Sequence, residues 1–181
     1  MSEETDAALV DRCRNGERRA FDTLLRRHAQ PIFAAAFRIL HAREDAFDVT
    51  QTAFLTAYEH LDRYDPGQPF RGWLYRIAVN EALDLVRGRR PVEALTDEVV
   101  DDHEGPDDRA VRDENEVAMQ GALMRLTADY RTVIVLKHVQ GCSYEEMAVI
   151  LECPVKTVKS RLFTARQALR GILVAGGVQW R

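Results

Sequence analysis

The sequence predicts an all-α protein, with two small helical domains joined by an acidic linker. Apolar residues recur at intervals of three and four along most of the chain, and no segment shows the sustained alternation of a half-buried strand. Residues 91–116 contain prolines, a glycine and a net charge of −9, whereas residues 1–90 are neutral and residues 117–181 carry +5. Such a stretch is typical of a linker. We therefore divide the chain into 1–90, 91–116 and 117–181.

The composition excludes several classes of protein. The hydrophobic content of 46% is ordinary for a globular protein. Cys13, Cys142 and Cys153 form no CxxC pair and no cluster with histidine, so we interpret them as reduced thiols and expect no disulfide, metal or cofactor. The N-terminal stretch is too polar for a secretory signal, and the longest apolar runs are far too short for a membrane span. A cytoplasmic protein without membrane insertion is expected.

The first domain is predicted to be a helical bundle with one prominent loop. The expected order is a helix around residues 20–28, a helix over 31–40, a helix over 45–61, a loop over 62–70 and a helix over 71–87. Pro31 is assigned to the start of its helix, because proline lacks the N–H that a first turn leaves unpaired. The loop is predicted because Pro66-Gly67 and Pro69 interrupt any regular structure. An all-α bundle would bury the apolar stripes of these helices.

The second domain is predicted to contain a helix-turn-helix. We expect helices over residues 117–126 and 130–139, a short helix from Ser143 through Leu151, and a last helix over 155–169. Ser143 and Glu146 have the spacing of a capping box, which pairs backbone N–H groups at a helix start. Residues 152–154 are a tight connection containing a proline. Two helices joined by such a short turn have the outline of a helix-turn-helix.

The last predicted helix has an apolar face and a cationic face. Val158, Leu162, Ala165 and Leu169 fall on one stripe, which we expect to pack inward. The opposite and flanking positions hold the candidate DNA-binding residues: Lys156, Thr157, Lys159, Ser160, Arg161, Thr164 and Arg166. Cations near a helix start suit phosphate, and the hydroxyl side chains suit base edges in the major groove. A merely solvated cationic face is the alternative; the preceding capped helix and the absence of acid after Glu152 favour DNA contact.

Three segments resemble a known family. "LTADYRTVIVLKHVQGCSYEEMAVILECPVKTVKSRLFTAR", residues 126–166, resembles the −35-reading domain of extracytoplasmic-function sigma factors. "DAFDVTQTAFLTAY" and "FRGWLYRIAVNEALDLVRGRR", residues 45–58 and 70–90, resemble their −10 and core-polymerase-binding domain. The likeness covers about residues 18–90 and 117–170. It implies a non-enzymatic sigma subunit that binds bacterial core RNA polymerase and promoter DNA and is held inactive by an anti-sigma protein.

The resemblance also implies site residues in the first domain. Six residues would dock to core polymerase: Asp45, Asp48, Val49, Gln51, Phe54 and Leu55. Two of them are acids, and they lie beside an apolar ridge at Phe54–Leu55. Residues that would open the −10 element and hold an extruded base are Tyr64, Phe70, Arg71, Trp73, Arg76, Asn80, Arg87, Arg89 and Arg90. A core role for Trp73 is at least as favoured as base stacking, because it begins an apolar stripe with Ile77.

The chain departs from the family at a few positions, and alternatives stay open. Phe47 and Thr52 replace common acids, and Lys156 replaces a common glycine, which indicates altered polymerase contacts and an unusual −35 preference. The acidic linker either follows a basic polymerase channel or is only a spacer. A stand-alone helix-turn-helix regulator explains the second domain alone, and a sigma-mimicking protein would lack the cations. An enzyme is disfavoured, because the histidines are scattered without a nucleophile or metal-ligand pattern.

Overall fold

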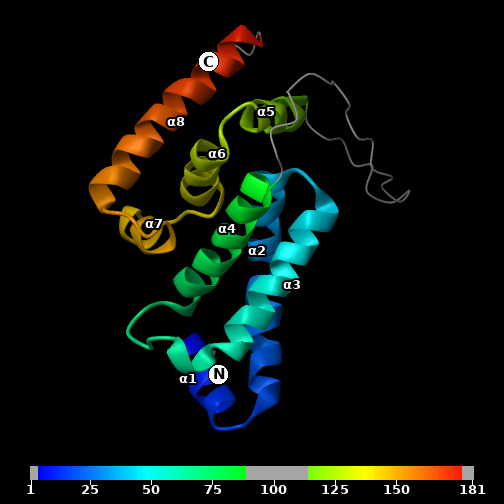
Figure 1. Ribbon diagram of the computed structural model, residues 1–181, viewed down its shortest axis with the longest axis vertical. Helices are drawn as coiled ribbons and strands as arrows, with labels where there is room; N and C mark the ends of the chain where they lie inside the picture. Colours follow the sequence, from blue (N-terminus) through cyan, green and yellow to red (C-terminus); the bar gives the residue numbers. More distant parts are fainter. Residues whose placement is uncertain (1–3, 89–113, 177–181) are drawn as a thin grey trace.

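The protein is all-helical in the computed structural model, which describes residues 4–88 and 114–176, with backbone alone for 114–118 (Figure 1). Its elements are α1 (Asp6–Arg14), α2 (Arg18–Leu40), α3 (Arg43–Glu59), a 3-10 turn (Leu61–Arg63), α4 (Phe70–Gly88), α5 (Glu114–Met124), α6 (Ala128–Ile134), a π-helical turn (Val135–Val139), α7 (Tyr144–Ile150) and α8 (Val155–Ala175). The all-α prediction is confirmed. Most of the predicted linker lies outside the described residues, and its last residues already belong to α5.

Helix α2 is one continuous helix, so the predicted break at Pro31 is wrong. Leu24, His28 and Ile32 are all buried on one side of the helix, across the position of the proline. This shared buried stripe packs against α3 and α4 (Figure 1). Proline removes one helical hydrogen bond, and burial of a long apolar stripe on both sides of it offsets that loss.

Helix α1 was not predicted from the sequence. Thr5 caps it by accepting a hydrogen bond from the N–H of Ala8 at 3.3 Å. Only Leu9 and Val10 are buried in this nine-residue helix, so its amphipathic signal is weak. They join the core against α2. Tertiary packing therefore stabilises a short segment whose buried stripe consists of two adjacent residues.

The second group of helices contains the predicted helix-turn-helix. Ser143 Oγ accepts from the N–H of Glu146 at 3.0 Å, and the Glu146 carboxylate accepts from the N–H of Ser143 at 2.7 Å, which confirms the capping box. Glu152 has a left-handed φ of 49° in the turn between α7 and α8. The predicted helix over 130–139 begins at Ala128 and ends in the π-helical turn. Helix α8 continues past the predicted end, because Leu173 is also buried.

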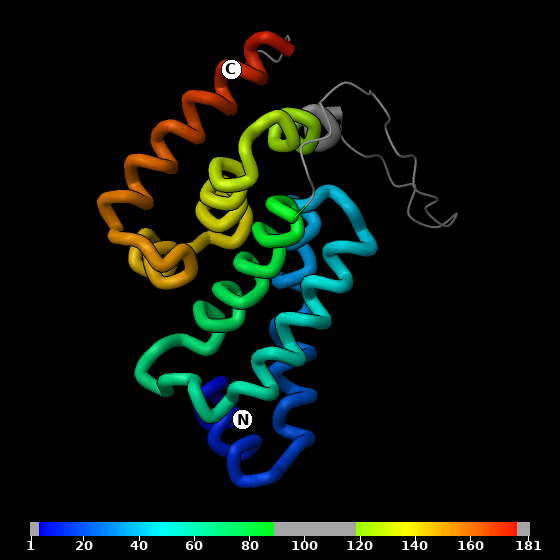
Figure 2. The backbone as a smooth tube through the Cα atoms, in the orientation of Figure 1, coloured from blue at the N-terminus to red at the C-terminus, as the bar shows by residue number. Residues whose placement is uncertain are grey.

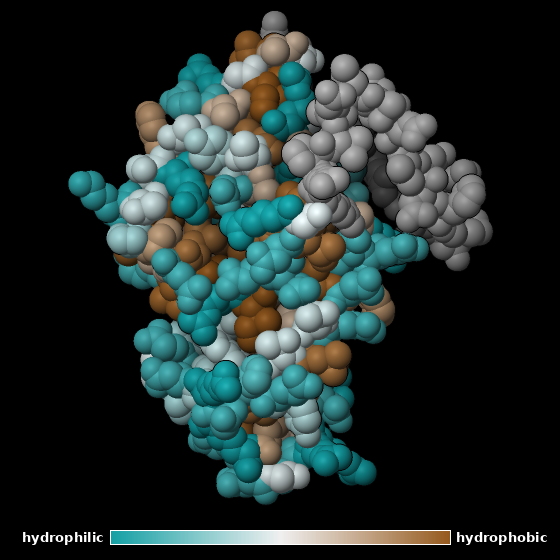
Figure 3. Space-filling view, viewed as in Figure 1, coloured by the Kyte–Doolittle hydropathy of each residue, from teal (hydrophilic) through white to brown (hydrophobic). Residues whose placement is uncertain are grey.

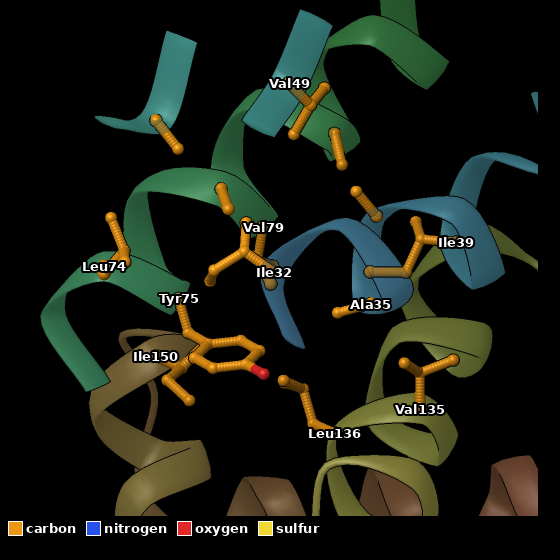
Figure 4. Packing of buried hydrophobic residues seen from close by; sticks show 14 of the residues in the cluster. Ile32, Ala35, Ile39, Val49, Leu74, Tyr75, Val79, Val135, Leu136 and Ile150 are labelled. Carbon is orange, nitrogen blue, oxygen red and sulfur yellow. The ribbon is translucent and has the colours of Figure 1, made fainter. Parts of the chain in front are cut away.

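The two groups of helices pack against each other through α4. Figure 2 shows α4 running between the α2–α3 pair and the second group, and α4 contacts both α6 and α7. The ring of Tyr75 lies beside Ile150 and Leu136 from the second group and near Ile32 of α2 (Figure 4). The buried residues of both groups therefore form one continuous cluster. Among the described helices, none is long and apolar enough to cross a membrane.

Candidate nucleic-acid interface

The cationic face of α8 is open to solvent. Val158, Leu162 and Ala165 are fully buried, as the helical periodicity predicts, and they orient the remaining faces outward. Among the candidate DNA-binding residues, the exposed ones are Lys156, Lys159, Ser160, Thr164 and Arg166, and the half-buried ones are Thr157 and Arg161. Helix α8 contains no Asp or Glu, so it carries no carboxylate that could neutralise its own cations. The exposed cations Lys156, Lys159 and Arg166 can therefore meet an anionic partner.

Two side-chain contacts orient cations of α8. Lys159 Nζ lies 5.3 Å from the ring centroid of Tyr144, within the range of a cation–π contact. Arg166 Nε donates to His138 Nε2 at 3.1 Å. Burial, Arg166 and Lys137 each lower the pKa of His138, in that order, and a neutral imidazole can accept this hydrogen bond. Tyr144 at the start of α7 and His138 in the π-helical turn thus position two cations of α8 through uncharged side chains.

The basic residues of α4 are mostly engaged by the second group of helices. Arg71 Nη2 donates to the carbonyl of Gln140 at 2.5 Å, and its guanidinium lies over the Tyr75 ring. Arg76 pairs with Glu152 at 3.4 Å. Arg87 pairs with Asp84 at 3.2 Å and lies 3.9 Å from Asp129. The candidate −10 surface is therefore partly covered in this arrangement, in contrast to α8.

The remaining candidate −10 residues differ in exposure. Asn80 is exposed, whereas Arg89 and Arg90 lie outside the described residues. Tyr64 and Phe70 are buried, which corrects the expectation that they offer stacking surface. Their ring centroids are 5.5 Å apart, and burial raises the pKa of the Tyr64 phenol. Trp73 is half-buried, and its ring centroid lies 5.5 Å from that of Tyr64. Trp73 therefore packs against the core, which is one of the two roles expected for it.

Some of the candidate polymerase-binding residues on α3 are buried and others are exposed. Val49 and Phe54 are buried, so they belong to the core, and the expected ridge at Phe54–Leu55 is reduced to Leu55, which is 64% exposed. Asp48 and Gln51 are exposed, and Asp45 is half-buried. Helical spacing predicts that Val49 is buried, because it lies on the same inward stripe as Ala46, Ala53 and Ala57.

Sequence reasoning missed two members of the outward face of α3. Phe47 is 55% exposed and Tyr58 is 40% exposed. With Gln51 and Leu55 they follow a spacing of four, four and three, which is one face of a helix. Phe47 and Asp48 also line a shallow depression with Phe33. Exposed aromatic and aliphatic groups beside acids are typical of a protein-binding surface. On the face shown in Figure 3, the lower half of the molecule is mainly hydrophilic.

A helix-turn-helix with an open cationic helix, carried beside a bundle with an apolar–acidic face, defines a DNA-binding transcription factor with a protein partner. Residues 24–92 match the family Sigma-70 region 2, and residues 116–169 match Sigma-70, region 4. The chain belongs to the extracytoplasmic-function sigma factors of the sigma-70 family. It is a non-enzymatic RNA polymerase sigma factor that directs promoter-specific transcription initiation. The match to region 2 sets aside a stand-alone helix-turn-helix regulator.

Relatives and solved structures support this assignment over nearly the whole chain. The RNA polymerase sigma-H factor of Pseudomonas aeruginosa is 36% identical, over 93% of this chain and 94% of the relative. The ECF RNA polymerase sigma-E factor of Escherichia coli K12 is 35% identical, over 93% and 95%. CnrH, solved with the cytosolic domain of CnrY, has a TM-score of 0.74 and 33% identity, over 95% of this chain and 99% of that one. RpoE of Bartonella quintana, solved with the anti-sigma factor NepR, has a TM-score of 0.68 and 28% identity, over 84% and 96%.

Proposed function

We propose that three surfaces of this chain have separate roles in transcription initiation. Helix α8 reads the −35 element, the loop over 65–69 with the basic face of α4 opens and holds the −10 element, and the outward face of α3 binds core polymerase. The supporting domains are residues 1–90 and 117–181, joined by the acidic segment 91–116. Work on promoters requires a cytoplasmic location. The observation that carries the proposal is the open cationic face of α8, whose apolar side is fully buried.

Occupancy of the −10 element requires the two groups of helices to separate in this proposal. Arg71 and Arg76 are engaged by Gln140 and Glu152 in the closed arrangement, so they reach DNA only after those contacts break. These polar contacts lie beside the shared apolar core, and water can replace them when the groups separate. Because RpoE is found in complex with an anti-sigma factor, we propose that an anti-sigma protein holds this chain closed as well. Binding of core polymerase would supply the opposing free energy.

Run-off transcription with core polymerase tests the −35 assignment. On fragmented genomic DNA, the wild-type chain should produce discrete transcripts that core polymerase alone does not. Lys156→Ala with Lys159→Ala should abolish transcripts from −35-dependent promoters and leave core binding unchanged, because both side chains are exposed on α8. Arg170→Ala is the matched control: it removes a cation from the exposed C-terminal half of the same helix. An equal loss in the control, or loss of core binding in the double variant, would contradict this assignment.

The α3 surface is tested by its exposed apolar residues. Phe47→Ser with Leu55→Ser should weaken binding to core polymerase about tenfold, because exposed apolar anchors carry much of the affinity of an interface. The melting temperature should stay near the wild-type value, since neither side chain is in the core. Val174→Ser, which changes another exposed apolar residue far along α8, should bind core polymerase normally. Unchanged affinity in the double variant would remove α3 from the polymerase interface.

A further inference from the structure

Arg14, the last residue of α1, makes a set of hydrogen bonds that reaches across the bundle. Its Nε and Nη2 donate to the carbonyl of Leu61 at 3.0 and 2.6 Å, and Nη2 also donates to the carbonyls of Asp62 at 3.4 Å and Tyr64 at 2.5 Å. The guanidinium carbon lies 5.9 Å from the Tyr64 ring centroid. The side chain is 28% exposed. One cation from α1 thus binds carbonyls at the start of the 3-10 turn that follows α3 and just after its end.

The position of this turn suits an arginine. Carbonyls at the end of a helical turn have few partners along the chain and carry the negative end of the dipole, and that of Leu61 accepts only from the N–H of Tyr64, at 3.2 Å, among the described main-chain donors. Helix α3 ends at Glu59, and the 3-10 turn follows directly. A planar guanidinium offers several donors in a fixed fork, so it can serve several of these carbonyls together, whereas a lysine ammonium is a single compact centre. Arg14 therefore acts as a cap supplied by a different helix.

The capped turn leads directly into the loop over residues 65–69. Tyr64 is buried at its base and its hydroxyl donates to the carbonyl of Gln68 at 2.6 Å. The N–H of Gly67 donates to the Asp65 carboxylate at 2.9 Å. Residues 65–69 are all exposed, so burial does not fix their shape. The shape of the loop depends on Tyr64, and the position of Tyr64 depends in part on Arg14.

Helix α1 is itself firmly anchored. Asp6 accepts from Arg27 and lies 2.8 Å from Nε2 of the buried His28, both on α2. Leu9 and Val10 are fully buried in the core. These contacts fix α1 relative to α2. Arg14 therefore extends from an anchored helix: its Nε and Nη2 donate to protein carbonyls, and its Nη1 lies 3.8 Å from the Asp11 carboxylate.

We propose that Arg14 is a positioning residue that presets the loop over 65–69 for the extruded −10 base. This inference rests on the proposed function of that loop. When the loop already has its bound shape, binding of the base does not lose the conformational entropy of ordering an exposed loop. Arg14 acts through the turn and Tyr64 and does not touch DNA. Residues 6–14 lie outside the segment that matches Sigma-70 region 2, so the device is an addition to the matched segment.

The experiment measures binding of a single-stranded non-template oligonucleotide by holoenzyme. The oligonucleotide carries the −10 sequence of a promoter found by run-off transcription, with 2-aminopurine at the extruded position. Arg14→Lys and Arg14→Gln should each weaken its binding about tenfold, with unchanged affinity for core polymerase and for a −35 duplex. Arg12→Ala is the matched control, because Arg12 lies on the same helix but pairs only with Glu4 and Glu17 at the surface among the described contacts.

Two further measurements separate positioning from general stability. In a Trp180→Phe background Trp73 is the sole tryptophan, and its emission reports the packing of Tyr64 and Phe70. The Arg14 variants should shift this emission to the red while the helical content stays unchanged. Tyr64→Phe, which removes only the hydroxyl bond to Gln68, should weaken oligonucleotide binding about threefold. Both results would support a role for Arg14 through the loop.

The outcomes separate this inference from the proposed function. Failure of the wild-type holoenzyme to bind the −10 oligonucleotide would overturn the proposed function of the loop. Normal binding by the wild type and by both Arg14 variants would overturn the inference alone. Equal losses of −10, −35 and core binding in the Arg14 variants would also overturn it, because Arg14 would then support the fold as a whole.

Discussion

Helices α8 and α4 both present arginine or lysine at positions predicted to meet DNA, but their cations are in different states. The cationic face of α8 is open, and that helix contains no acid. The arginines of α4 contact Gln140, Glu152 and Asp129 of the other group of helices. Cations of α8 are thus exposed to solvent, whereas those of α4 are engaged by residues of the other group of helices. The difference indicates that access to DNA is set by the domain arrangement as much as by charge.

The largest expected effect comes from the buried arginine that joins the two groups. Arg131 is 6% exposed and donates to the carbonyls of Ile39, Leu123, Met124 and Leu126. Arg131→Met should lower the free energy of unfolding by about 3 kcal/mol, because several buried carbonyls lose their donor. Denaturant unfolding checks this value. A loss below about 0.5 kcal/mol, the usual range of a surface substitution, would show that water replaces the guanidinium easily.

A second prediction tests whether the α4 cations are masked. Glu152→Ala removes the side-chain partner of Arg76 and leaves α4 unchanged, so the free chain should bind the −10 oligonucleotide about threefold more tightly. Fluorescence anisotropy measures this affinity. Because loss of an acid alone favours DNA binding, Glu145→Ala, an exposed acid on α7, is the charge-matched control. Equal gains in both variants would mean that only net charge has changed and that the contacts do not mask the surface.

A third prediction concerns the hydroxyl bond between the two groups. Tyr75 is fully buried, and its hydroxyl donates to Gln140 Oε1 at 2.6 Å. Tyr75→Phe should lower the free energy of unfolding by about 1 kcal/mol at neutral pH. Burial raises the pKa of Tyr75 to about 12 from the ordinary 10. The unfolded chain therefore loses this proton first, so the wild type should lose stability between pH 10 and 12 while the variant lacks this contribution.

Thermal unfolding of both proteins from pH 9 to pH 11 measures this difference. The stability advantage of the wild type over Tyr75→Phe should shrink as the pH rises. A constant difference across this range would show that the Tyr75 hydroxyl titrates normally in the folded chain.

The smallest expected effect is at His138, which orients Arg166 on α8. The folded-state pKa of His138 lies below its ordinary value of 6.5, so the unfolded chain takes up the proton first as the pH falls. Its contribution to stability is full above pH 6.5 and is lost below that, toward the folded pKa. His138→Gln keeps an acceptor and removes the titration. The wild type should therefore lose slightly more thermal stability than the variant between pH 7.5 and 5.5; parallel curves would contradict this.

Much of the second domain was predictable from local sequence. The capping box at Ser143 is a chemical signal of a helix start, and the stripe through Val158 and Leu162 is a strong helical period. The helix bounds and the buried residues of the first domain were harder to predict. Pro31 indicated a break that tertiary packing overrides, and the two buried residues of α1 are adjacent and so show no helical spacing. Which aromatic residues face inward, such as Tyr64, depends on packing between elements that are distant in sequence.

The contacts between the two groups use two kinds of acceptor. Arg131 and Arg71 donate to main-chain carbonyls, those of Ile39 and Gln140, whereas Tyr75 donates to a side-chain oxygen. Any amino acid supplies a carbonyl, so chimaeras that exchange whole domains between related chains should retain the contacts of Arg131 and Arg71 whatever residue stands opposite. The contacts of Tyr75, Arg76 and Arg87 would need Gln140, Glu152 and Asp129 to be transplanted with them. A chimaera that keeps these three partners should therefore retain the closed arrangement while its promoter preference changes.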